Sequence, residues 1–397
     1  MLSPESAGII RATLPVVGAS LDAIATRFYD TMFTERPELL DGMFNRGNQA
    51  NGEQRKALAG SIAAFAAALI ERPDERPDRM LARIAHKHTA VGITSDHYII
   101  VQKYLFGAIA EVLGDAVTPQ VAAAWDEVYW LMAGALIALE AQIYAEAGAR
   151  DGNTWRQWHV IGRREETPDV ASFLLRPADD DPVPPGRPGQ YVSVRMRMPD
   201  GVYQLRQYSL SGCSEGGLRR ITVKRVRGGD APDGEVSTLL HATVEVGDEL
   251  TLSAPFGDVA LEDGEAPLVL VSAGIGYTPM AAMLEHLVAT GSTRRVLLLH
   301  ADRCRADHAL REDMEQFIDT LPGAERILWY EEKACGHART GRMDLTGVEI
   351  PEGAVAYMCG PLPFMRDVRA QLIKAGVAAR DIHYEVFGPD LWLGADD

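Results

Sequence analysis

The sequence predicts three domains of different fold class: an all-α domain at residues 1–148, an antiparallel β-barrel at 153–262 and an α/β domain with a mainly parallel sheet at 266–397. The first block has helical periodicity and alanine-rich apolar faces, without a convincing alternating strand. The second block alternates apolar and polar residues between turn-rich pieces, and the third alternates short apolar runs with helical stretches. A chain of 397 residues is long enough for two or three domains.

The composition is that of a globular protein, with 47% hydrophobic and 24% charged residues. A net charge of -17 argues against nonspecific binding to nucleic acid or anionic membranes, which attract basic surfaces. The four cysteines form no CxxC pair, which disfavours a zinc site or a disulfide framework. The N-terminus does not resemble a signal peptide, and the longest apolar run, 128–139, is too short to span a bilayer. We therefore expect a cytoplasmic protein with no stable membrane association.

The helical block should contain six or more helices, with its prolines near helix starts or in connections. The segment GARDGN at 148–153 then ends the helical pattern. In the barrel block we expect strands at 170–176, 191–198, 219–227 and 249–254, and a further strand that carries 206–209. In the last block we expect strands at 268–273, 295–300, 327–330, 354–359 and 383–387, covered by helices on both faces.

Helical periodicity selects one of two neighbouring histidines in the segment LARIAHKHTAVGITSDHY. Leu81, Ile84, Ala85 and His88 fall at i, i+3, i+4 and i+7, which places His88 on an apolar helix face. His86 lies roughly 200° further round, on the basic face. A buried imidazole with a solvated neighbour suits a haem iron ligand, but it equally suits an ordinary core histidine. The helix pattern alone leaves both interpretations open.

Two glycine turns follow buried strands of the last block. One is GIGYTPM from Gly274, which runs from a strand into a helix and can bring the backbone close to a pyrophosphate at the helix N-terminus. This GxGxxP pattern is weak alone, because glycines also make tight turns. The second turn, Cys359-Gly360-Pro361, strengthens the prediction, since two such turns at one sheet edge mark a nucleotide-binding crevice.

The barrel block carries the sequence RQYS at Arg206 to Ser209. On a strand, Arg206 and Tyr208 share one face, which sets a phosphate-pairing guanidinium beside an aromatic plane. An exposed arginine and a core tyrosine would give the same pattern. Because this barrel directly precedes a nucleotide-binding sheet, flavin binding is the better interpretation.

The order RQYS, GxGxTPM, CGP and the closing YEVFGP resembles the ferredoxin reductase type of flavin and nicotinamide module. With the helical domain in front, essentially the whole chain is similar to the flavohaemoglobins, the bacterial nitric oxide dioxygenases. The resemblance implies a globin domain with haem b, an FAD-binding barrel and an NAD(P)H-binding domain. It also implies that O2 and NO are the small-molecule partners, and we expect a monomer.

The resemblance assigns roles to individual residues. His88 would be the iron ligand, with Tyr98 and Glu140 as its hydrogen-bonding partners, and a carboxylate there would increase electron density at iron. Tyr29 and Gln54 would act on the ligand side of the haem, where Phe44 and Leu58 line the pocket; Gln54 and Leu58 share a helix face at i, i+4. Implied cofactor contacts are Lys87, Tyr191, Arg206, Gln207, Tyr208, Ser209, Gly274, Gly276, Thr278, Pro279, Cys359, Gly360, Pro361, Glu385 and Phe387. Phe387 would cover the flavin ring, and Lys87 would pair with Glu385.

The chain departs from the family pattern at three places, each of which affects one cofactor site. Tyr277 stands where glutamine is usual, Val386 where cysteine is common, and the loop 228–235 is longer than usual. Asp302 suits a ribose 2′-OH, whereas Arg303 or Arg305 suits a 2′-phosphate, so the sequence does not choose between NADH and NADPH.

Two other functions fit parts of the pattern. The chain is an oxygen carrier or sensor if the helical domain only binds its ligand, although a reductase would then have no obvious purpose. It is a flavin-dependent reductase serving iron or a redox partner if the helical domain holds no haem.

Overall fold

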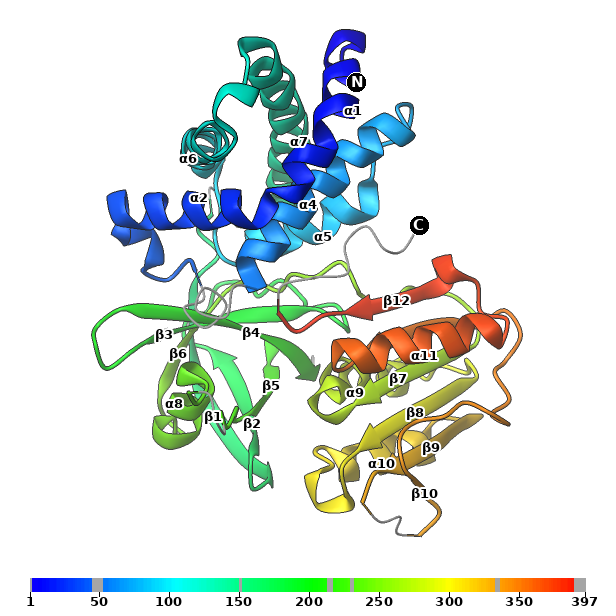
Figure 1. The fold of residues 1–397 in the computed structure, drawn as a ribbon. Coiled ribbons are helices and arrows are strands. Elements are labelled where there is room, and N and C mark those ends of the chain that lie inside the picture. The colour runs from blue at the N-terminus through cyan, green and yellow to red at the C-terminus, as the bar shows by residue number, and fades with distance from the viewer. Residues whose placement is uncertain are drawn as a thin grey trace. The chain divides into compact units, whose positions relative to one another are not determined.

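A computed structural model describes residues 2–44, 53–149, 152–212, 217–228, 232–332 and 336–388, with the side chains of 53–57 and 59 excepted. The chain divides into two compact units, which we describe separately (Figure 1). The helical unit comprises Met1–Thr154, Arg195–Leu205 and Gly388–Asp397. The sheet unit comprises Trp155–Val194 and Arg206–Phe387.

The helical unit contains six α-helices among its described residues, as the sequence predicts. They are α1 (Pro4–Ala19), α2 (Leu21–Glu35), α4 (Glu53–Glu71), α5 (Asp78–Thr89), α6 (Ser95–Leu113) and α7 (Pro119–Glu146), with short 3₁₀ turns η1 (Pro37–Leu40) and η2 (Gly114–Ala116). Both proline-initiated helices α1 and α7 are capped, since the hydroxyls of Ser3 and Thr118 accept from the backbone N–H of Ser6 and Val121.

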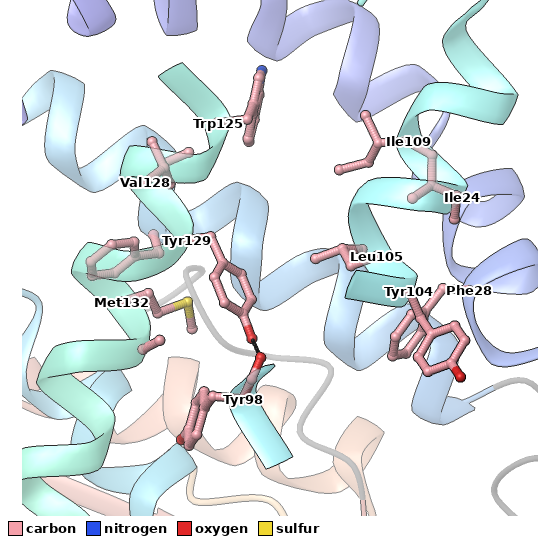
Figure 2. Packing of buried hydrophobic residues seen from close by; sticks show 14 of the residues in the cluster. Ile24, Phe28, Tyr98, Tyr104, Leu105, Ile109, Trp125, Val128, Tyr129 and Met132 are labelled. Atoms are coloured by element: carbon pink, nitrogen blue, oxygen red, sulfur yellow. Dashed lines mark hydrogen bonds between the residues drawn. The ribbon is translucent and has the colours of Figure 1, made fainter. Parts of the chain in front are cut away.

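The core of this unit forms where α2, α6 and α7 face one another. Figure 2 shows Ile24 and Phe28 from α2, Leu105 from α6 and Trp125 from α7 among its side chains. Within the described residues, α7 is long and apolar enough to cross a membrane by length and composition, and the α1–α2 pair, bent by 76°, passes the same test. Because α7 packs against α1, α4, α5 and α6, it serves here as the central helix of the core.

A closed six-stranded barrel has strand order β1-β2-β5-β4-β3-β6, and apart from the end of β3 and the start of β4 it belongs to the sheet unit. Its strands are β1 (Arg156–Thr167), β2 (Val170–Pro177), β3 (Tyr191–Arg197), β4 (Tyr203–Gly212), β5 (Arg219–Lys224) and β6 (Glu249–Leu252), and helix α8 (Glu235–Thr243) lies between β5 and β6. The predicted antiparallel barrel is thus confirmed. The sequence analysis missed β1, whose alternation is interrupted by irregular pairing at Val160/Gly162 and Glu165/Thr167, and it did not anticipate α8.

The second half of the sheet unit is a six-stranded sheet with order β10-β9-β8-β7-β11-β12. Its strands are β7 (Leu268–Ala273), β8 (Val296–Asp302), β9 (Ala324–Tyr330), β10 (Arg339–Thr340), β11 (Val355–Cys359) and β12 (Ile382–Glu385). Its helices are α9 (Tyr277–Ala289), α10 (Arg311–Thr320) and α11 (Leu362–Lys374), with short 3₁₀ turns η4 (Gly274–Gly276), η5 (Arg305–Asp307) and η6 (Ala379–Asp381). All registered pairs are parallel, as predicted.

The strand order reverses between β7 and β11. From β7 the chain proceeds to β8 and β9 on one side, whereas β11 and β12 lie on the other side (Figure 1). Right-handed crossovers in opposite directions place α9 and α10 on one face of the sheet and α11 on the other. The carboxyl ends of β7 and β11, where such sheets bind ligands, therefore flank a switch point.

Candidate functional site: a histidine pocket, a barrel strand and a sheet edge

His88 lies in the last turn of α5 and meets two polar side chains from other helices. Its Nδ1 is 2.8 Å from Glu140 Oε1 and 3.0 Å from Tyr98 Oη. The Tyr98 hydroxyl also donates to Glu140 Oε1, at 2.5 Å. Because a carboxylate only accepts, the proton belongs on Nδ1, which leaves Nε2 as the ring nitrogen that can bind a metal.

The carboxylate of this cluster is buried. The Glu140 side chain is 4% exposed, and Leu81 and Ala85, which share the helix face of His88, are fully buried. Burial and the neighbouring Glu140 raise the pKa of Tyr98, so its hydroxyl stays protonated and continues to donate. A buried carboxylate is thus stabilised by two donors, as its environment requires.

Two further tyrosines hold the cluster in place, and the sequence analysis did not single them out. The Tyr129 hydroxyl donates to the backbone oxygen of Tyr98 at 2.6 Å, a contact drawn in Figure 2, and the Tyr144 hydroxyl donates to that of Ile93 at 2.7 Å. Both tyrosines belong to α7, the helix that also carries Glu140. Their only sequence signal is an aromatic at helical spacing, which equally predicts plain core packing.

The structure describes most of the residues that the resemblance places on the ligand side of the haem. Tyr29 is buried on α2, its ring stacks on Phe33 and its edge meets Phe44 at 6.1 Å between ring centres. Leu58 packs against the core of the helical unit. Gln54 lies in the first turn of α4, but its side chain is outside the described residues.

His88 fits an iron ligand better than its neighbour does. Its side chain is 35% exposed, so His88 is half-buried and not fully buried as its helix face predicts, although Leu81 and Ala85 on that face are fully buried; its Nδ1 is engaged by Glu140 and Tyr98, which leaves Nε2 for a metal. His86, predicted as the solvated neighbour, is half-buried like His88, so the bonds of His88 to Glu140 and Tyr98, and not burial, distinguish His88 as the candidate ligand. The ammonium of Lys87 donates to the backbone oxygen of Gly388 at 2.7 Å. The predicted pairing of Lys87 with Glu385 stays a prediction, because these residues belong to different units.

Strand β4 presents the predicted flavin-binding side chains. Arg206 and Tyr208 are half-buried on one face, and burial lowers the pKa of the Arg206 guanidinium and raises that of the Tyr208 phenol. Ser209 is buried on the other face, and its hydroxyl has no hydrogen-bond partner among the described residues. Gln207 is exposed. The desolvated Arg206 guanidinium fits a phosphate-bearing cofactor such as FAD, and the Ser209 hydroxyl offers a further hydrogen-bonding group on the opposite face of the same strand.

Two neighbouring features extend this site. Thr238, in the first turns of α8, also has a buried hydroxyl without a partner in the described structure, whereas the Ser237 hydroxyl bonds the backbone at Gly234 and Val226. Tyr191 begins β3 and bonds Phe256 through the backbone, and its ring lies against Gly257. Only part of the long loop 228–235 is described, so its effect on the site stays a prediction.

At the sheet edge, the two glycine turns meet directly. A Cβ on Gly276 would lie 2.3 Å from the Cys359 backbone oxygen and 2.9 Å from the Gly360 nitrogen, so only glycine fits. Gly274 has φ +52 and nothing within 4 Å of a would-be Cβ. Thr278 donates to the Ile275 oxygen at 3.0 Å and fixes the start of α9, where Pro279 is also buried. The turn is thus tightly packed at Gly276 and open at Gly274, and the open position suits a pyrophosphate.

Tyr277, which departs from the family pattern, is buried at the start of α9. It is 2% exposed, and its ring makes edge contacts with His300 and His308. At the end of β12, Glu385 is buried and accepts a hydrogen bond from the backbone N–H of Val386. Phe387 is 49% exposed, and its predicted role over the flavin ring stays a prediction. Pro361 precedes α11 as its N-cap.

Comparison with known proteins matches each part. Family models for globins, for the oxidoreductase FAD-binding domain and for the oxidoreductase NAD-binding domain match residues 26–136, 157–261 and 270–370. The flavohemoprotein of Chromobacterium violaceum is 42% identical over 98% of both chains, and that of Rhizobium meliloti is 39% identical over 99% of this chain and all of its own.

Solved structures give the same result. The flavohemoglobin of Malassezia yamatoensis, whose crystal structure holds FAD and haem, is 41% identical, covers 98% of this chain and 100% of its own, and superposes with a TM-score of 0.91. The FAD- and NAD-binding part of a nitric oxide dioxygenase from Vibrio cholerae is 38% identical over 59% of this chain and 99% of its own, with a TM-score of 0.56. The chain therefore belongs to the flavohaemoprotein family, oxidoreductases that join a globin domain to FAD-binding and NAD-binding domains.

Proposed function

We propose that this flavohaemoprotein is an NAD(P)H-dependent nitric oxide dioxygenase that removes nitric oxide as nitrate. The observation that carries the proposal is the His88–Tyr98–Glu140 cluster in a chain that also contains a reductase. When bound, the three cofactors supply the redox chemistry: NAD(P)H gives two electrons as a hydride, FAD passes them on singly, and each electron allows one nitric oxide and one dioxygen to become one nitrate at iron.

The side chains divide this work between electron supply and ligand control. Glu140 accepts from His88 and so increases the electron-donating character of the imidazole, which favours oxygen activation over simple storage. Tyr29 and Gln54 would donate hydrogen bonds on the ligand side. Arg206, Tyr208 and Ser209 would hold FAD, and Phe387 would shield its ring. The expected monomeric state and cytoplasmic location remain predictions.

The decisive experiment is NADH-driven nitric oxide consumption under air, with nitrate measured as product and absorption spectra recorded before and after NADH. We expect Soret and flavin bands together with rapid consumption. A stable oxygen complex without turnover would favour the carrier or sensor. A flavin spectrum without a Soret band would favour a flavin-dependent reductase.

We further infer that NADH is preferred over NADPH. Asp302 ends β8 with its carboxylate held by the Arg303 backbone N–H at 2.8 Å and near His300 Nε2 at 3.7 Å. The Arg303 guanidinium pairs with Asp307 at 3.0 Å, which engages one of the two arginines that suit a 2′-phosphate and leaves the exposed Arg305 as the other, while the Asp302 carboxylate favours a ribose 2′-OH. We expect Asp302→Ser to lower the ratio of kcat/KM for NADH to kcat/KM for NADPH. An unchanged ratio would contradict the assignment.

A further inference from the structure

One carboxylate joins the two halves of the sheet unit. Asp313, in the first turn of α10, accepts from Arg164 of β1 at 2.9 Å through Oδ1 and from Arg220 of β5 at 2.5 Å through Oδ2. The Asp313 side chain is 12% exposed and that of Arg220 is 18% exposed, so this junction is largely screened from water. Pairs of this kind are less weakened by salt than surface pairs, and their geometry is fixed.

The junction continues through the barrel to the flavin-binding strand. The second terminal nitrogen of Arg220 donates to the Ser211 backbone oxygen at 2.7 Å, and Ser211 lies two residues beyond Ser209 on β4, where the pairing with β5 is irregular between Leu210 and Gly212. A chain of hydroxyls also leads there, because Ser211 bonds Thr222 at 2.7 Å and Thr222 bonds Ser172 at 2.8 Å.

On the other side, the junction continues into the nucleotide-binding sheet. Helix α10 begins directly after the segment 302–310, which carries Asp302. Leu310, just before the helix, is 1% exposed and has φ +56, and among the described residues it is the only non-glycine with a positive φ. A buried leucine held in the left-handed region fixes the direction in which α10 starts, and with it the position of Asp313.

We propose that Asp313 is a positioning residue that locks the nucleotide-binding sheet onto the flavin-binding barrel, so that nicotinamide and flavin meet at reacting distance. This inference rests on the FAD and NAD(P)H sites of the proposed function. Asp313 acts through other residues: through Arg220 and Ser211 on β4, and through α10 on the segment 302–310. A misplacement of about 1 Å between reacting groups can slow a reaction about 100-fold, so a lock at this junction has a measurable effect.

The test compares full-length holoprotein with Asp313→Asn and with the matched control Asp319→Asn. Asp319 lies on the same helix but is 77% exposed and pairs only loosely with Arg326, at 3.6 Å. Anaerobic stopped-flow mixing with NADH, and with NADH deuterated at C4, measures flavin bleaching without nitric oxide or oxygen. Hydrogen exchange of α10 and β5 in the same proteins reports the junction independently of activity.

We expect Asp313→Asn to slow flavin reduction about 10-fold to 100-fold at saturating NADH, to raise the deuterium isotope effect, and to change the half-saturating NADH concentration less than about threefold. Exchange should rise in the first turn of α10, and Asp319→Asn should match the parent. Arg164→Gln removes only the ion pair between Arg164 and Asp313, at a half-exposed residue, and should give a smaller effect in the same direction. It is the test variant if Asp313→Asn does not fold.

Flavin reduction within about twofold of the parent would overturn the proposal, even if the variant unfolded at lower temperature, because Asp313 would then have only a structural role. Failure of nitric oxide turnover in the parent would leave the flavin reduction measurement intact. The inference and the proposed dioxygenase activity therefore fail separately.

Discussion

The Glu140→Gln substitution tests whether the carboxylate beside His88 controls the haem iron. Both hydrogen bonds that Glu140 accepts, from Tyr98 at 2.5 Å and from His88 at 2.8 Å, end on the same oxygen, Oε1. The amide oxygen of glutamine can take this place with little change in geometry. The substitution therefore removes the negative charge while keeping the acceptor, and the ferric haem loses electrostatic stabilisation relative to the ferrous haem.

The size of the effect follows from the loss of charge assistance. A hydrogen bond to a charged group contributes about 1.5–3 kcal/mol, and one between neutral groups about 0.5–1.5 kcal/mol. The difference for the His88 bond is therefore about 1–1.5 kcal/mol. A one-electron couple shifts by about 59 mV for each tenfold change in equilibrium constant. We expect the haem midpoint potential to rise by up to about 65 mV.

Spectroelectrochemical titration of the purified holoprotein measures this potential, with the Soret band confirming that haem is retained. The matched control is Glu146→Gln, which removes a carboxylate from an exposed position on the same helix. A Glu140→Gln potential within about 10 mV of the parent, or below it, would show that the carboxylate does not tune the iron through His88.

Three other substitutions test the remaining sites. Ser209→Ala should weaken FAD binding about 3-fold to 10-fold in an equilibrium titration without lowering the stability of the apoprotein, since the hydroxyl has no partner among the described residues; an equal loss in apoprotein stability would contradict its assignment to the cofactor. Gly276→Ala should lower the free energy of unfolding by about 1–3 kcal/mol in urea and raise the KM for NADH, because its Cβ would lie 2.3 Å from the Cys359 backbone oxygen. The control Gly107→Ala, whose Cβ would have nothing within 4 Å, should stabilise α6. Equal effects of the two substitutions would exclude steric contact as the cause. Arg227 and Arg225 lower the pKa of Asp169 to about 2. Its ion pairs therefore stabilise the fold fully above the unfolded pKa of about 3.9, and this contribution is lost as the pH falls toward 2. The urea midpoints of Asp169→Asn and the parent should differ at pH 6 and converge near pH 2, and a constant difference would refute this account.

Much of the fold is predictable from the sequence because the strands of the parallel sheet are buried on both faces. Their continuous apolar runs place β7 at Leu268–Ala273, as the structure has it. Strand β1 escaped the same reasoning for a physical reason. Its pairing with β2 shifts at two irregularities, and Arg163 and Arg164 occur in succession, so the apolar and polar positions do not alternate over its length.

The candidate site was predictable where periodicity decides which way a side chain faces. Helical spacing selects His88 over His86, and glycine turns mark the ends of β7 and β11. Periodicity does not say which polar groups meet across the fold. Tyr129 bonds Tyr98, 31 positions away, and Asp313 bonds Arg220, 93 positions away. Nothing in the local sequence distinguishes these residues from an ordinary core tyrosine or surface aspartate.

Glu140 and Asp313 each accept from two donors, but they should respond differently to the corresponding amide. Glu140 receives both donors on one oxygen, so glutamine keeps both contacts and changes only the charge. Asp313 receives Arg164 and Arg220 on separate oxygens, so asparagine must turn its amide nitrogen, a donor, toward one guanidinium, which has no acceptor. One arm of the junction is then lost outright. Glu140→Gln should therefore leave the geometry around His88 intact while shifting a potential, whereas Asp313→Asn should move two packed domains with little direct effect on either cofactor's electronic properties.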